Sequence, residues 1–363
     1  MTTLTPTLLQ KREVLRTLFK QGIKPADNRR PIPEELAQQM VQDLIDSGFS
    51  KDSKIGVIDT FLTLTLTLIE HGFTNLFVLE NQHSKLTSDQ EKYYNIIQKG
   101  CERLGVKYYV PPMNNWKRCD MDFDIVIGNP PYQGGSEAKR WVIWHQFLEL
   151  ALIQSNHVSY IIPASITSPG KMWNLIRENL VSIDFTVGEH FKGVGSTFCR
   201  IVVDKNFSGD TTIITETEKL QLNVSDYDFL PPNVTSHNLD LYQFFTKKRE
   251  WKRTTEYHTS KKSKWSDDNG EIEVWHTNAQ TLRTNTPHPN NNLIRVGVTL
   301  SGYPEFKVMN KVGGSQVIVY TVCDTVEEAQ QLANYLNGPD IQEVLSVFKW
   351  SGWNSIEVIK LLG

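Results

Sequence analysis

The chain has 363 residues, which is room for two domains of about 150 residues each. Hydrophobic residues make up 39% of it and its formal net charge is −3, so the composition excludes a disordered chain and a uniformly basic nucleic-acid-binding protein. The four cysteines show no zinc-ligand spacing, and the sequence shows neither a secretory signal nor an apolar run long enough to span a bilayer. We therefore expect a cytoplasmic protein without a metal site or membrane contact.

Helical and strand patterns alternate through the first half of the chain. An amphipathic helix is predicted over residues 4–22, and a second helix begins after Pro33 and ends at Gly48. Further helices are predicted over 88–104, 139–154 and 172–180, and buried strands over 54–59, 75–80, 106–110, 123–128, 157–163, 185–187 and 198–203. This alternation predicts an α/β fold with a doubly wound, mostly parallel sheet, whose ligands bind at the carboxyl ends of the strands.

The composition changes past about residue 210. Residues 226–233 contain a double proline that suits a linker, and the following stretch is rich in Asn, Thr, Lys and Trp. Two helices are predicted near the end of the chain, over 327–336 and 341–348. We therefore expect a first domain over residues 1–215 and a second, α+β domain over residues 216–363.

The sharpest local signal is the segment 128–133, GNPPYQ, which directly follows a predicted strand. Two consecutive prolines fix φ twice and remove two hydrogen-bond donors, so they hold the turn rigid. The side chain of Asn129 and the carbonyl of Pro130 become fixed acceptors, and Tyr132 offers a flat face beside them. Two acceptors and a stacking plane suit a planar NH₂ group, whereas the structural alternative is a Pro-Pro turn with a buried tyrosine.

This motif and its surroundings resemble the amino-methyltransferases that use S-adenosylmethionine, above all the adenine-N6 DNA methyltransferases of restriction-modification systems. The resemblance covers roughly residues 30–210, where DFDIVIGNPPYQ, WVIWHQFLELAL, VSYIIPASI and GEHFKGVGSTFCRIVVDK follow the family's order after a similar opening, RRPIPEELAQQM. The closing TVEEAQQLANYLN and FKWSG are similar to the end of the family's target-recognition domain. The resemblance implies a Rossmann-like methyltransferase domain followed by a C-terminal target-recognition domain.

The resemblance also implies roles for individual residues. Asn129 and Pro130 would accept the two N6 hydrogens of an adenine rotated out of the duplex, in a turn that Pro131 keeps rigid. Tyr132 would stack on one face of the base and Phe191 on the other, although a core residue beside a strand is the alternative for Phe191. The cofactor S-adenosylmethionine would be bound by Pro33, Asp59, Thr60, Glu80 and Asn129, with Glu80 bonding the ribose hydroxyls.

The turn after the first predicted strand departs from the family's pattern. The family has a glycine-containing loop there, whereas Asp59 is followed by TFLTLTLTLIEH and by no glycine until Gly72. Residues 63–68 alternate like a strand, although a buried helix accounts for them equally well. The base-binding half therefore matches the family while the cofactor half departs from it, which leaves a DNA-binding protein that does not methylate as an alternative.

A local basic patch lies between Lys247 and Lys264, where eight Lys or Arg residues stand against two Glu, interleaved with Trp251 and Tyr257 and followed by Trp265. We expect this patch to contact phosphates, with a solvated basic surface as the alternative. The expected DNA-binding residues are Lys247, Lys248, Arg249, Lys252, Arg253, Lys261 and Lys262. Further candidates for reading base edges are Trp275, His276, Arg283, Arg295 and Asn290–Asn292.

These patterns together predict an S-adenosylmethionine-dependent adenine-N6 DNA methyltransferase. Its expected partners are double-stranded DNA and a separate restriction endonuclease. Methylation of an RNA base is an alternative, because the turn at Asn129 recognises only an NH₂ group.

Overall fold

The computed structural model describes residues 17, 30–59, 61–80, 86–110, 121–134, 141–191, 197–245, 249–278, 280–350 and 354–362. Nearly all of the helix expected over 4–22 lies outside these residues, as do Thr60, Lys247 and Lys248. The chain forms two compact units. The first extends to Tyr227, apart from residues 167–170, which belong to the second unit with residues 228–363.

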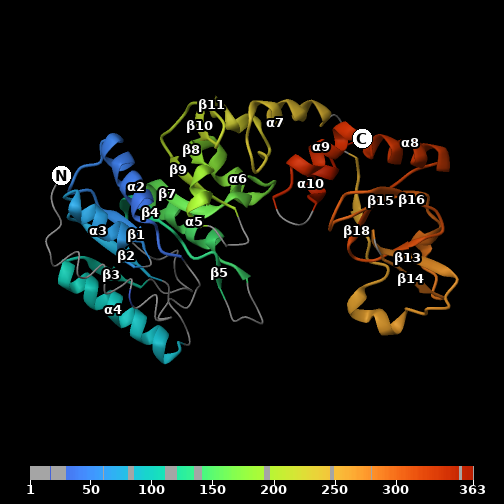
Figure 1. Ribbon diagram of the computed structural model, residues 1–363, viewed down its shortest axis with the longest axis horizontal. Coiled ribbons are helices and arrows are strands. Elements are labelled where there is room, and N and C mark those ends of the chain that lie inside the picture. The colour runs from blue at the N-terminus through green and yellow to red at the C-terminus, as the bar shows by residue number, and fades with distance from the viewer. Residues whose placement is uncertain are drawn as a thin grey trace. The chain divides into compact units, whose positions relative to one another are not determined.

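A nine-stranded sheet forms the centre of the first unit, in the order β11-β10-β8-β9-β7-β4-β1-β2-β3 (Figure 1). Its strands are β1 (Ile55–Ile58), β2 (Leu76–Leu79), β3 (Lys107–Tyr109), β4 (Phe123–Gly128), β7 (Ser155–Pro163), β8 (Leu180–Asp184), β9 (Phe198–Asp204), β10 (Thr211–Ile214) and β11 (Lys219–Leu222). The five strands β3, β2, β1, β4 and β7 are parallel, and β9 runs antiparallel to β7 and β8. The expected mostly parallel α/β sheet is therefore confirmed. The strand order reverses between β1 and β4, where ligands bind in such sheets.

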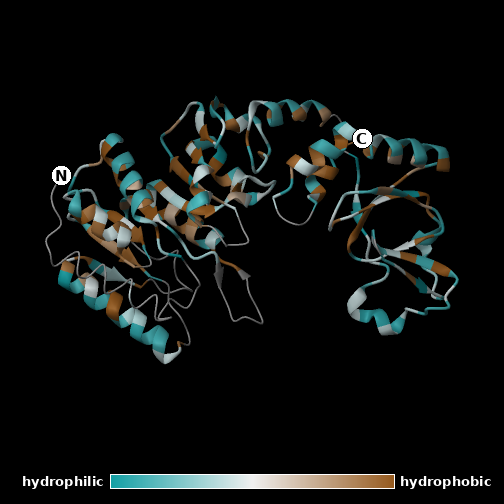
Figure 2. Ribbon diagram, in the orientation of Figure 1, coloured by the Kyte–Doolittle hydropathy of each residue, from teal (hydrophilic) through white to brown (hydrophobic). Residues whose placement is uncertain are grey.

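Helices cover both faces of this sheet. The helices α2 (Glu34–Asp46), α3 (Thr63–Glu70) and α4 (Ser88–Leu104) share one apolar core with β1, β2 and β4, and α5 (Trp144–Gln154) contacts β4 and β7. Helix α4 begins at a capping box of Thr87 and Gln90 and ends at Gly105, whose φ of 69° suits glycine. Figure 2 shows the central strands mostly hydrophobic and α4 mostly hydrophilic, as expected for a helix with only one buried side.

Several expected elements differ from the structure. Residues 185–187, expected as a strand, belong mostly to the 3₁₀ helix η4 (Thr186–Phe191), and the strand lies before them in β8. Residues 141–142 form the short strand β6 (Trp141–Val142), which pairs with β5 (Gln133–Gly134), so the expected helix over 139–154 begins only at Trp144. The first unit also extends past residue 215, because β10 and β11 add a hairpin to the edge of the sheet.

The second unit has an α+β composition. Its strands are β12 (Lys252–Arg253), β13 (Ile272–Thr277), β14 (Gln280–Thr284), β15 (Arg295–Thr299), β16 (Phe306–Met309), β17 (Gly313–Gly314) and β18 (Ile318–Val322). They form a four-stranded sheet, β12-β18-β15-β16, and a three-stranded sheet, β14-β13-β17. Its helices are α7 (Ser236–Asp240), α8 (Val326–Leu336), α9 (Pro339–Val347) and α10 (Ile356–Ile359). Of the helices within the described ranges, none has the length and apolar character needed to cross a membrane.

Candidate active site

The turn after β4 depends on Gly128. Strands β1 and β4 pair so that Gly128 lies opposite Ile58, and the backbone N–H of Asn129 donates to the Ile58 carbonyl over 2.9 Å. Gly128 has a φ of 144°, and a Cβ added there would lie 2.1 Å from the Ile58 oxygen. Only glycine allows this close approach of the two strands, so the turn starts from a fixed position at the edge of the sheet.

The amide of Asn129 has a defined orientation. The residue is fully buried, and its Nδ2 donates to the Arg30 carbonyl over 2.9 Å. Its Oδ1 accepts a hydrogen bond from the Tyr132 hydroxyl. Because a carbonyl oxygen can only accept, the Arg30 contact identifies the nitrogen of the amide and leaves Oδ1 as the acceptor on the other side. Arg30 was not among the residues that the sequence pointed to.

Tyr132 bonds back to Asn129 within the same turn. It is half-buried, and its hydroxyl also lies 3.4 Å from the Ile161 carbonyl. Burial raises the pKa of the phenol well above its ordinary value, the neighbouring Cys199 raises it further, and the hydrogen bond to Asn129 partly offsets both. The phenol therefore stays protonated at neutral pH and donates its proton to Asn129.

A third aromatic residue joins the pair expected to hold the base. The ring of Phe198 lies 4.7 Å from that of Tyr132, centroid to centroid, with 33° between the planes. It also lies 5.2 Å from the ring of Phe191 at 54°. Phe191 and Phe198 are both buried. Phe198 was missed in the sequence, where it is one apolar residue among several at the start of a strand.

The turn after β1 is organised around helix α3. Asp59 is fully buried, and its Oδ2 accepts from the backbone N–H of Thr65 over 2.8 Å and from its hydroxyl over 3.0 Å. These bonds satisfy a donor in the first turn of α3, as a capping side chain does. Leu62, just before the helix, adopts the left-handed conformation with a φ of 58°. Of the two interpretations of residues 63–68, the helix is therefore confirmed.

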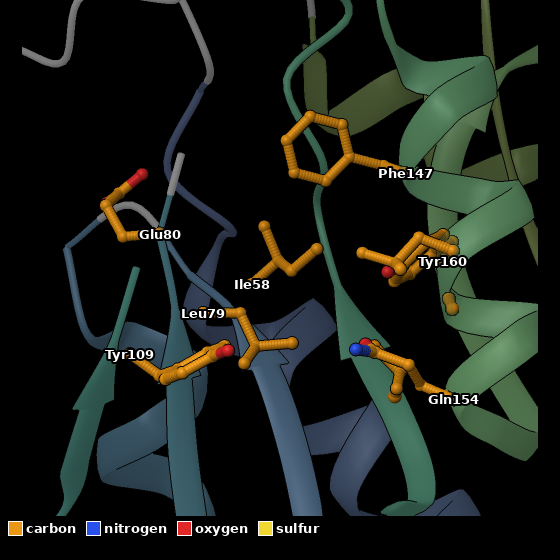
Figure 3. A pocket seen from close by; sticks show the side chains of 10 residues that line it. Ile58, Leu79, Glu80, Tyr109, Phe147, Gln154 and Tyr160 are labelled. Atoms are coloured by element: carbon orange, nitrogen blue, oxygen red, sulfur yellow. The ribbon is translucent and has the colours of Figure 1, made fainter. Parts of the chain in front are cut away.

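A second carboxylate follows β2. Glu80 is 2% exposed and lies beside a small hollow whose apolar lining comes from β1, β2, β4, β7 and α5. Figure 3 shows Ile58 and Leu79 on one side of this hollow, with Phe147 and Tyr160 on the other. Its volume is about 10 Å³, the space of one water molecule.

The buried thiol of Cys101 is affected by the charges of both carboxylates. Burial raises its pKa to about 12, and the charges of Asp59 and Glu80 contribute to this rise. Asp59 and Glu80 directly follow β1 and β2, which pair in parallel, so both carboxylates lie at the same edge of the sheet. No cluster of potential metal ligands occurs in the part of the chain that the structure describes.

The pattern of residues 53–184 matches the model of the Eco57I restriction-modification methylase family. The chain carries a methylase domain of the restriction-modification type. The matched segment contains Asp59, Glu80 and the turn from Gly128 to Tyr132, and it ends before Phe191 and the second unit. No curated protein sequence matches the chain.

Solved structures similar to this chain include methyltransferases. One, from Listeria monocytogenes and described as a class I S-adenosylmethionine-dependent methyltransferase, has a TM-score of 0.42 and 13% identity over 57% of this chain and 72% of its own. Another, from Pyrococcus horikoshii and described as an RNA methyltransferase, has a TM-score of 0.32 and 14% identity over 54% and 96%. Because these TM-scores lie below 0.5, only the family match identifies the methylase domain.

The methyl donor of such a methylase is S-adenosylmethionine, and the strand ends of this sheet suit its chemistry. The ribose hydroxyls of the donor are hydrogen-bond donors, and its amino group and sulfur are positively charged, so carboxylates are suitable partners. Asp59 and Glu80 supply two buried carboxylates at the ends of adjacent strands. Pro33 precedes α2, and its carbonyl accepts from Ala37 in the first turn of that helix.

The expected DNA-binding residues of the second unit differ in their exposure. Lys252, Arg253, Lys261 and Lys262 are exposed, as is Lys264. Arg249 lies 3.4 Å from Glu328, with only 27% of its side chain exposed. Lys261, Lys262 and Lys264 belong to the 3₁₀ helix η7 (Thr259–Lys264), and Lys252 and Arg253 form β12.

Arg295 is not available as a base reader. Its side chain is fully buried and lies 2.6 Å from the carboxylate of Glu256, which is also buried. It donates to the Val312 carbonyl over 2.6 Å, and its guanidinium lies 4.8 Å from the ring centroid of Tyr320. Arg295 therefore makes its polar contacts inside the second unit, which the sequence alone did not indicate.

Proposed function

We propose that the chain is an S-adenosylmethionine-dependent DNA methyltransferase that modifies the N6 amino group of adenine. The observation that supports this best is the turn after β4, where a buried amide is held with its oxygen free of backbone contacts and next to an aromatic face. A planar NH₂ group needs two acceptors in its own plane, and Asn129 Oδ1 and the Pro130 carbonyl are the two candidates. An adenine that has left the duplex presents such a group.

The chain's own residues then orient the amine. As Oδ1 of Asn129 and the carbonyl of Pro130 accept the two N6 hydrogens, electron density shifts toward the nitrogen, and its lone pair turns out of the plane of the base. When bound, S-adenosylmethionine supplies a methyl group on a positively charged sulfur. The Arg30 carbonyl fixes the acceptor in advance, because an amide turned the other way would offer N–H to the amine.

Two substitutions should separate base binding from cofactor binding. Asn129→Ala removes an acceptor that acts on the target nitrogen, so methyl transfer should fall by about 100-fold or more while the Kd for S-adenosylmethionine stays within about threefold. Glu80→Ala should do the opposite and raise that Kd by about 10- to 100-fold, the effect of one charge-assisted hydrogen bond. Transfer is measured with tritiated donor on DNA of mixed sequence, and the Kd by calorimetry.

The matched controls come from the same sheet and its helices. Asn75 directly precedes β2, at the edge of the sheet opposite the site. Its Nδ2 reaches only the Asp52 carbonyl, at 3.5 Å, so Asn75→Ala removes an amide that has no role in the site. Glu102→Ala removes an exposed carboxylate from α4. Both variants should retain transfer and cofactor affinity. Full activity of Asn129→Ala would overturn the proposed role of the turn.

We also propose that η7 and β12 form the DNA-binding surface of the second unit. The side chain of Gln316 accepts from the backbone N–H of Thr259 over 2.9 Å and donates to the Thr259 hydroxyl over 2.5 Å, and Arg253 donates to the Gln316 carbonyl over 2.6 Å. These bonds hold η7 and β12 to the same turn. The exposed lysines of η7 thus extend from a fixed base, which suits contact with phosphates.

Replacing Lys261, Lys262 and Lys264 together by Ser should weaken DNA binding and make its dependence on salt shallower. Each lost phosphate contact removes about 0.9 from the slope of log K against log salt. Replacing Lys92, Lys99 and Arg103, which lie exposed on α4, removes the same charge elsewhere and should leave the slope unchanged. Equal slopes in the two variants would show that η7 only carries a solvated surface.

A DNA-binding protein that does not methylate is the second candidate, and the turn after β1 favours it. Asp59 there bonds Thr65 of its own chain, in a turn without glycine. Calorimetric titration with S-adenosylmethionine decides between the two functions. Micromolar binding supports the methyltransferase, and no binding at millimolar donor supports the second candidate.

A further inference from the structure

Phe198 lies where the target base is expected. It is the first residue of β9, it is 2% exposed, and its ring contacts the rings of Tyr132 and Phe191. The centroid distances of 4.7 and 5.2 Å fall within the range of about 4.5–7 Å over which aromatic rings pack favourably. Phe198 therefore packs against both rings expected to stack on a base, with its plane tilted by 33° from that of Tyr132 and by 54° from that of Phe191.

The polar part of the same site is also engaged within the protein. Oδ1 of Asn129, the acceptor assigned to the N6 amine, receives the hydroxyl of Tyr132. Because burial keeps that phenol protonated, the bond persists across the neutral pH range. A base that enters the site must replace the hydroxyl at Asn129 and the ring of Phe198 at Tyr132.

We propose that Phe198 occupies the target-base slot while no DNA is bound, and that a base rotated out of the duplex must displace it. This proposal rests on the proposed function, because it concerns the same slot. Displacement adds a cost to base capture. Phe198 therefore limits how tightly an extruded base is held, and the effect is seen with bases that leave the duplex easily.

The test compares two duplexes with randomised flanking sequence. In one, a single adenine faces an abasic site, and in the other it faces thymine. Phe198→Leu keeps most of the side-chain volume but loses the flat ring, and Phe198→Ala removes both. Each variant should bind the abasic duplex about three- to tenfold more tightly than the wild type does, the fold-change of about one aromatic pair, with unchanged affinity for the paired duplex.

Two further variants should have the opposite effect on binding of the abasic duplex. Phe191→Leu removes a ring expected to stack on the base and should weaken binding of the abasic duplex. Phe198→Trp enlarges the occupant and should weaken it as well. Thermal unfolding of each variant shows whether it is folded, and Phe198→Leu keeps the test decisive if Phe198→Ala does not fold.

The outcomes separate the two proposals. If both Phe198 variants bind the abasic duplex no better than the wild type, while Phe191→Leu binds it less well, Phe198 is part of the wall of the slot. The displacement is then overturned and the proposed function stands. If the wild type and every variant bind both duplexes alike, the protein captures no base, and both proposals fail.

Discussion

The turns after β1 and β4 begin side by side, at Ile58 and Gly128, yet they use their polar groups differently. After β4, a glycine brings the strands together and two prolines follow, and the amide of Asn129 is anchored by the Arg30 carbonyl. After β1 there is no glycine, and the carboxylate of Asp59 bonds Thr65 of the following helix.

The two turns differ in what the polar side chain of each one bonds. At β4 the side-chain acceptor Oδ1 is oriented by the protein but bonded only to a hydroxyl that can rotate away. At β1 the carboxylate satisfies a buried backbone N–H, and moving it would leave that donor unpaired. The β4 turn thus leaves its acceptor to a side-chain hydroxyl, as the proposed binding of an amine requires, whereas the β1 turn stabilises its own helix.

The largest expected effect comes from Gly128→Ala. The added methyl group would lie 2.1 Å from the Ile58 oxygen at a φ of 144°, so β1 and β4 must separate or the turn must move. We expect methyl transfer to be lost. The free energy of unfolding should fall by about 1–3 kcal/mol more than the backbone strain alone explains, because overpacking adds to it. Urea denaturation measures this fall.

Gly170→Ala separates strain from clash. Gly170 has nearly the same φ, 150°, but a Cβ there has no neighbour within 4 Å. It should show only the backbone strain, about 1–3 kcal/mol, and retain transfer. If the two variants lose equal stability, the close approach of β1 and β4 is not what requires Gly128.

The parts of the fold that followed from sequence were those with local signals. Helix α4 matched its prediction because Thr87 and Gln90 mark its start and Gly105 its end. The alternation of apolar strands with helices predicted the mostly parallel sheet. Residues 185–187 were misassigned, because a short apolar run does not distinguish a strand from a 3₁₀ turn packed on β9.

The next effect concerns Asp59. Asp59→Ala leaves the buried N–H of Thr65 without its acceptor, so the free energy of unfolding should fall by about 2 kcal/mol. Asp59→Asn keeps an oxygen acceptor and should lose less, and Thr65→Val removes only the hydroxyl bond of 3.0 Å. Chemical denaturation should rank the losses in that order, Asp59→Ala being the largest. Unchanged stability in Asp59→Ala would show that the capping bonds do not stabilise α3.

Asp59→Asn also tests whether the β1 turn serves the cofactor. The variant keeps the acceptor for Thr65 and removes the negative charge that suits the cationic end of S-adenosylmethionine. A Kd that rises while stability stays near the wild type's would give Asp59 both roles. A Kd equal to the wild type's would restrict the turn to supporting α3.

The candidate site could be predicted only as far as its motif. Asn129, Pro130 and Tyr132 were found because two prolines after a strand are a local pattern, whereas Arg30 and Phe198 reach the site through the fold. Arg30 acts through its backbone carbonyl, which any residue would supply, so its type carries no signal. Arg295 was misjudged for a different reason: its side chain pairs with Glu256, which is distant in sequence.

The smallest expected effect comes from Tyr132→Phe. The ring proposed to stack on the base remains, and the lost hydroxyl frees Oδ1 of Asn129, so transfer should change by no more than about threefold. Tyr132→Ala removes the stacking face as well and should lower transfer by about 5- to 150-fold. Tyr320→Phe, in the second unit, is the control. Equal losses in Tyr132→Phe and Tyr132→Ala would assign the role to the hydroxyl, and the β4 turn would then resemble the β1 turn in depending on an internal bond.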